Sequence, residues 1–76
     1  MNIKDLAAGV RRLQRDEAFG DLIAQIKKDQ GDVFFNPHSS YEDREEAHTI
    51  IRALEKIEGR MAQILQDEAI YDKKRK

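Results

Sequence analysis

The chain has 76 residues, of which 38% are charged and 39% hydrophobic, and its formal net charge is -1 at pH 7. A domain of this size has barely enough residues for one core, so packing against further copies is expected to supply part of the burial. The small net charge excludes a strong overall field for nucleic acid or an anionic membrane, and the absence of cysteine excludes disulfides and thiolate ligands. Because no apolar run is long enough for a signal peptide or a membrane span, we expect a cytoplasmic protein with no membrane partner.

The first half of the chain predicts two helices separated by a short break. Apolar residues at helical spacing predict a short amphipathic helix over 3–14. Asp16 is a typical N-cap, so a second helix is expected over 17–35, with a kink at Arg15 and Asp16. The apolar residues of this second helix are Phe19, Leu22, Ile23, Ile26, Val33 and Phe34.

The second half predicts one long helix. Residues 36–40 carry turn chemistry, since Pro37 disfavours a helical conformation at Asn36 and the serines after it can cap a helix. A helix over 41–72 and a basic tail over 73–76 are expected to follow. Its apolar stripe steps alternately by three and four residues, and only Glu68 interrupts it: Ala47, Ile50, Leu54, Ile57, Met61, Ile64, Glu68 and Tyr71.

These elements predict an all-α fold, an antiparallel helical hairpin with a short extra N-terminal helix in a single domain, 1–76. Ile51 and Leu65 widen the stripe beyond what one partner helix covers, so a homo-oligomer with coiled-coil-like packing is expected to complete the fold. Phe34 and Phe35 cluster with Tyr41 near the hairpin tip, and together with Ile51 and Leu65 they are the predicted interface residues. Alternatively, the aromatic rings simply close the end of the core.

Residues that would indicate an enzyme are missing from the sequence. His38 and His48 have no further histidine or cysteine at metal-ligand spacing. Ser39 and Ser40 are explained by helix capping, and there is no glycine-rich phosphate loop. We therefore expect no catalytic residue, no metal and no cofactor.

A polar flank at the start of the long helix offers two interpretations. Tyr41, Arg44, His48 and Arg52 recur at three- and four-residue intervals beside the apolar stripe. They could bind an anion such as a nucleotide, or a carboxylate of a partner protein. The alternative is a set of ion pairs within the molecule, such as Glu45 with Arg52.

The basic tail is likewise open to two interpretations. Lys73, Lys74, Arg75 and Lys76 could contact nucleic acid without sequence preference, and the cations of the N-terminal helix would extend this surface if that helix folds nearby. Alternatively, the four cations complement the negative end of the helix dipole.

Several segments together resemble the short helical proteins that tailed bacteriophages encode near their packaging and virion genes. They are Asp16–Phe19, Arg44–His48, Ile51–Leu54 with Ile57, and the lysine-rich end. This resemblance implies a phage origin and a role in assembly, in DNA packaging or in control of the host, acting in the host cytoplasm or within the virion.

The leading hypothesis is therefore a non-enzymatic, homo-oligomeric accessory of phage assembly or packaging that docks helices onto another phage or host protein. One alternative is a phage-encoded inhibitor of host defence that binds a host protein or sequesters a nucleotide signal. Another is nonspecific nucleic-acid binding through the basic tail.

Overall fold

The computed structural model describes residues 1–75 and the side chains of residues 1–74. Its helices are α1 (Ile3–Arg15), α2 (Glu17–Phe35) and α3 (Tyr41–Arg75), and no strand occurs among the described residues. The predicted all-α fold is thus confirmed. The predicted basic tail is, as far as Arg75, the last turn of α3, and Lys76 lies outside the described residues.

Each helix begins at a side chain that caps a free backbone N–H group. The capping oxygen accepts from the amide three residues further on, over 2.9–3.1 Å. The caps are Asn2 for α1, Asp16 for α2 and Ser40 for α3. Because such caps satisfy donors that the helix itself cannot, they fix where each helix begins.

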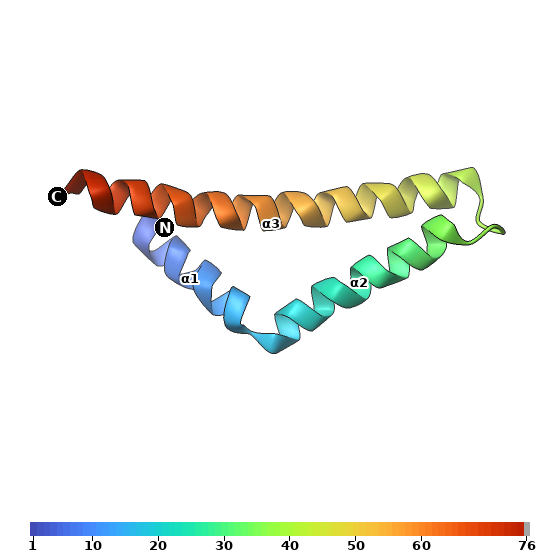
Figure 1. The fold of residues 1–76 in the computed structure, drawn as a ribbon, viewed down its shortest axis with the longest axis horizontal. Helices are drawn as coiled ribbons and strands as arrows, with labels where there is room; N and C mark the ends of the chain where they lie inside the picture. The colour runs from blue at the N-terminus through green and yellow to red at the C-terminus, as the bar shows by residue number, and fades with distance from the viewer. Residues whose placement is uncertain (76) are drawn as a thin grey trace.

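Asp16 alone separates α1 from α2, at the predicted kink. Its backbone is extended, with φ -81° and ψ 113°, and its N–H donates to the carbonyl of Leu13 over 3.2 Å. The same residue therefore ends α1 and, through its side chain, starts α2. The result is the V-shaped pair of helices in Figure 1.

The connector between α2 and α3 is organised around Asn36. Its side-chain oxygen accepts from the N–H of His38 at 2.9 Å, and its carbonyl accepts from the N–H of Ser39 at 3.1 Å. The same carbonyl accepts from Nη2 of Arg44 at 3.0 Å, which ties the connector to the first turn of α3.

The helices form an elongated molecule with α3 along its whole length (Figure 1). α2 runs antiparallel to the first half of α3, α1 lies beside its second half, and the α1–α2 junction points away from it. The molecule measures 57 × 22 × 17 Å. Since a helix with its side chains is about 10 Å across, the chain is roughly two helices thick.

Burial within this thin arrangement is slight. The buried apolar residues are Ala7, Val10 and Ala47, and no large side chain among the described residues is fully buried. The predicted stripe of α3 does face the other helices, but only Ala47 and Glu68 of its members are buried, and Ile57 and Tyr71 are exposed. Two packed helices cannot enclose a large side chain on all sides, which accounts for the small core.

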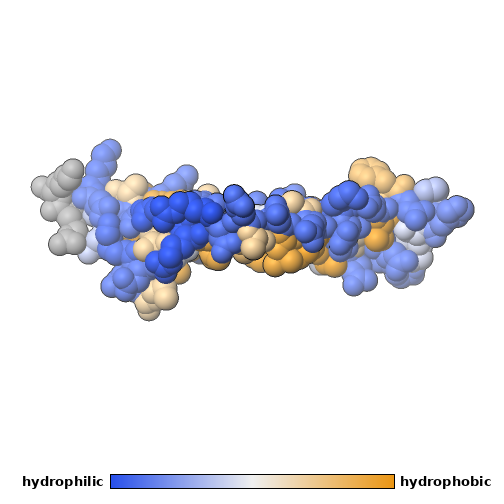
Figure 2. Space-filling model, turned by 90° about the horizontal axis from the view of Figure 1, so that it is seen from below, coloured by the Kyte–Doolittle hydropathy of each residue, from blue (hydrophilic) through white to orange (hydrophobic). Residues whose placement is uncertain are grey.

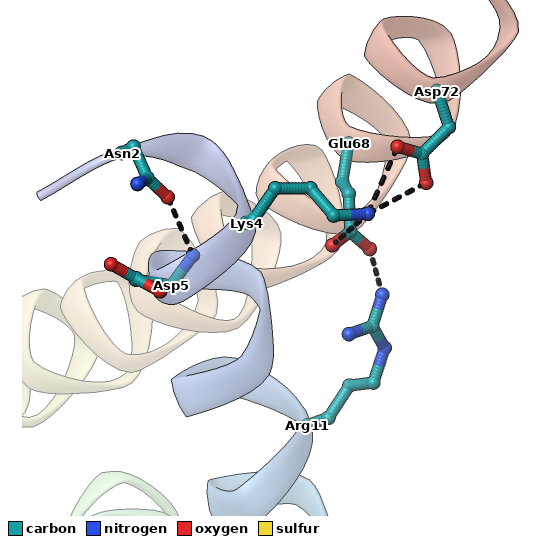
Figure 3. A network of polar contacts seen from close by, with 6 residues as sticks. All are labelled: Asn2, Lys4, Asp5, Arg11, Glu68 and Asp72. Atoms are coloured by element: carbon teal, nitrogen blue, oxygen red, sulfur yellow. Dashed lines mark hydrogen bonds and ion pairs between the residues drawn. The ribbon is translucent and has the colours of Figure 1, made fainter.

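Ion pairs hold α1 against the end of α3, as Figure 3 shows. Glu68, whose side chain is 5% exposed, accepts from Arg11 and lies 3.2 Å from Nζ of Lys4. Lys4 also binds both carboxylate oxygens of Asp72, at 2.9 and 2.8 Å. The one polar member of the predicted stripe is therefore paired with two cations of α1.

Candidate interaction surface

Large apolar side chains from all three helices remain on the surface of the chain. One group lies along the body of the molecule and comprises Leu6, Leu13, Leu22, Ile57 and Tyr71. A second group lies near the α2–α3 connector and comprises Phe34, Phe35 and Tyr41. Met1 and Ile70 are exposed as well.

The ion pairs between helices show which side of the molecule is polar. Lys4 and Arg11 of α1 pair with Asp72 and Glu68 of α3, and Lys27 of α2 pairs with Glu58 of α3 over 2.5 Å. Glu68 belongs to the packed row of α3 itself, and the other residues lie beside the row of their helix that packs against a neighbouring helix. We call the side of the molecule that carries them the ion-paired face.

In α1, the exposed leucines lie on the other side of the buried row. Leu6 follows Lys4 by two residues, and Leu13 follows Arg11 by two residues, so each leucine is about 200° round the helix from its cation. The buried Ala7 and Val10 lie between the two sets.

In α2 and α3, too, the exposed apolar residues lie away from the ion-paired ones. Ile57 directly precedes Glu58, and Tyr71 directly precedes Asp72, so each lies about 100° round α3 from a residue of the ion-paired face. In α2, the five-residue step from Leu22 to Lys27 corresponds to about 140°. Leu6, Leu13, Leu22, Ile57 and Tyr71 therefore lie on one flank of their helices, with the packed rows between them and the ion pairs on the other flank.

We call this side the apolar face and define it by Leu6, Leu13, Leu22, Ile57 and Tyr71 together with the half-buried Ile50 and Ile64. Ile50, Ile57, Ile64 and Tyr71 follow one another at seven-residue steps along α3. Figure 2, which views the molecule from the α1–α2 junction, shows hydrophobic side chains gathered along the middle of the lower edge and mainly hydrophilic ones along the upper edge.

Leu13 lines two shallow hollows, one on the apolar face and one that Glu58 of the ion-paired face lines as well. One, of about 530 Å³, lies on α1 and is lined by Leu6 and Val10 among others. The other, of about 300 Å³, lies between the α1–α2 junction and α3, where Phe19 and Met61 line it. Both are open, and their linings mix apolar side chains with polar ones such as Glu58 and Arg12.

The predicted anion-binding flank is divided by the fold. Arg44 donates to the Asn36 carbonyl, and its buried Nε has no hydrogen-bond partner. The ring of His48 lies 6.2 Å from that of Phe34, centroid to centroid. Tyr41 is exposed, and Arg52 lines a separate shallow hollow with Lys56. The four residues do not form one cation-lined pocket.

The four predicted interface residues fall in two places. Phe34 and Phe35 stand edge to face at the hairpin tip, with ring centroids 5.3 Å apart, and Phe35 is 81% exposed. Ile51 and Leu65 are half-buried, and each lies seven residues from a member of the ion-paired face. Seven residues are about two helical turns, so Ile51 and Leu65 lie on the same flank of α3 as Glu58 and Asp72. The more exposed apolar residues of α3 lie on its other flank, which differs from the flank predicted from Ile51 and Leu65.

Lys4 and Arg11 of α1 reach the last turns of α3, which also carry the exposed Lys73 and Lys74. Lys4 and Arg11 are neutralised there by Asp72 and Glu68. The ion pairs therefore reduce the positive charge available for a phosphate backbone. The side chain of Arg75 and all of Lys76 lie outside the described part.

Among the described residues, no three histidine, aspartate or glutamate side chains converge as a metal site would require. None of the helices over residues 1–75 combines the length and the hydrophobicity of a membrane span. Searches with protein-family models and against curated proteins and solved structures gave no match.

Sequence reasoning found the helices but missed the apolar face. Its signal was present in the seven-residue steps from Ile50 to Tyr71 and from Leu6 to Leu13. A helical stripe, however, does not reveal which of its two flanks a neighbouring helix covers. That depends on how α1 and α2 approach α3.

Proposed function

We propose that this chain is a non-enzymatic helical interaction protein that works as a homo-oligomer and docks its helices onto other proteins. The observation that carries the proposal is the lack of any fully buried large side chain among the described residues. A fold stabilised mainly by hydrophobic burial needs such a core, and a second copy can supply it.

The surface area of the chain gives the same indication. The chain exposes 6143 Å², whereas a compact monomer of 8.8 kDa exposes about 4,800 Å². Its radius of gyration is 16.5 Å, against about 11 Å for a compact domain of this length. The excess of roughly 1,300 Å² is of the size that a subunit buries in a stable oligomer.

The aromatic side chains at the hairpin tip offer a surface for a different protein. Phe35 ends α2 and Tyr41 begins α3, and both side chains are largely exposed. Large aromatic side chains are common anchors at protein interfaces. Together with the phage-like sequence segments, they favour an accessory role in phage assembly or packaging, with another phage or host protein as the partner.

Thermal unfolding at several protein concentrations tests this proposal. Because association stabilises the folded form by mass action, the midpoint should rise with concentration, by about 3–6 °C per tenfold increase for a dimer of this size. Circular dichroism at 222 nm follows the loss of helix. A midpoint that stays constant from about 1 µM to 1 mM would contradict the proposal, since it would show a fold complete within one chain.

A further inference from the structure

We propose that the apolar face is the contact between two copies of this chain, packed face to face about a two-fold axis. This inference rests on the proposed homo-oligomer and adds the surface that closes it. The ion-paired face then stays in water, where Lys27 and Glu58 are already 38% and 48% exposed.

The exposed area of the whole chain is large enough for a dimer contact on the apolar face. It runs over three helices, from Leu6 on α1 through Leu22 on α2, and along α3 from Ile50 to Tyr71. A stable interface of ordinary size buries about 800 Å² on each partner. That is less than the roughly 1,300 Å² by which the chain exceeds a compact monomer, so one such contact removes most of the excess.

The thickness of the molecule favours a second copy as the occupant. One chain is about two helices thick, so two chains face to face give the cross-section of a four-helix bundle. In that arrangement Ile57 and Leu22 have neighbours on every side. A two-fold axis uses the same patch on both subunits, so no other partner is needed to cover it.

The spacing along α3 is compatible with this symmetry. Ile57 lies next to the midpoint of α3, and Ile50 and Ile64 are each seven residues away from it. A two-fold axis across α3 at Ile57 therefore sets Ile50 of one copy opposite Ile64 of the other. The seven-residue step keeps such a row facing a partner helix along its length.

A pair of matched substitutions on α3 tests the face. Ile57 is 50% exposed and Ile70 is 53% exposed, and both are isoleucines of the same helix. Ile70, however, lies about 200° round the helix from the buried Glu68 and about 140° round from Ile57, so it points outward from the packed row of α3 and not along the row of Ile57. Ile57→Glu should weaken self-association at least about 100-fold, because a buried unpaired carboxylate costs several kcal/mol. Ile70→Glu should leave it unchanged.

Leu22→Glu extends the test to α2, where the leucine is 54% exposed. Light scattering at matched concentrations gives the mass of each variant. Loss of association in Ile57→Glu and Leu22→Glu, but not in Ile70→Glu, supports the inference. If the unsubstituted chain associates and both face variants associate equally well, the face is wrong but the proposed function stands. If the unsubstituted chain is a monomer throughout, both fail.

A labelling experiment covers the case in which the glutamate variants do not fold. The chain has no cysteine, so Ile57→Cys and Ile70→Cys each introduce a single thiol. The rate of maleimide labelling at position 57 should fall with protein concentration, about tenfold where nine-tenths of the chains are associated. The rate at position 70 should not change. Equal rates at both positions across the association range would overturn the inference.

Discussion

At the scale of single residues, Glu68 shows how a polar side chain fits an apolar stripe. It occupies the position that an aliphatic residue would take in the periodic pattern of α3, and it is nearly buried. Arg11 and Lys4 reach it from α1. The sequence predicted the stripe and marked Glu68 as its exception, but the partners could not be predicted because they lie at the opposite end of the chain.

Removing a cation from this cluster should lower the stability of the fold more than removing the anion. Arg11→Ala leaves a nearly buried carboxylate with Lys4 as its remaining partner, so the free energy of unfolding should fall by about 1–3 kcal/mol. Glu68→Leu leaves two half-exposed cations that water can solvate and restores the apolar stripe, so its effect should be within about 1 kcal/mol. Urea denaturation at one protein concentration measures both. A larger loss for Glu68→Leu than for Arg11→Ala would contradict this account of the cluster.

At the scale of the helices, local signals were sufficient to predict most of the fold. Caps and apolar periodicity predicted α2 over its observed bounds and the starts of α1 and α3, because these signals act within a turn of the helix. The long helix was predicted to end at residue 72, but it continues through the basic residues to Arg75. Which flank stays exposed depends on contacts between helices, and that part was not predicted.

The role of Asp16 as the N-cap of α2 is readily tested by substitution. Asp16→Ala removes the side-chain acceptor for the N–H of Phe19, which should lower stability by about 1 kcal/mol. Asp16→Asn keeps an acceptor in place and should lie close to the unsubstituted chain. Thermal unfolding at matched concentration compares the three. If Asp16→Ala and Asp16→Asn lowered the stability equally, the side-chain cap would not determine where α2 begins.

At the scale of the whole molecule, the long thin shape sets the energetics. Helices that lie end to end along α3 leave it with one neighbour at each point, so the apolar residues of one flank stay in water. At about 25 cal/mol per Å² of buried apolar area, covering this flank is the largest stabilising contribution still open to the chain. We propose that association completes the hydrophobic core that the fold begins.

The mass of the purified chain in solution tests this claim most directly. Sedimentation equilibrium over a range of micromolar concentrations should give a mass near twice the 8.8 kDa of one chain, with dissociation only on dilution. A mass of 8.8 kDa at every concentration, with the helices intact by circular dichroism, would contradict the claim that one copy cannot complete its own core.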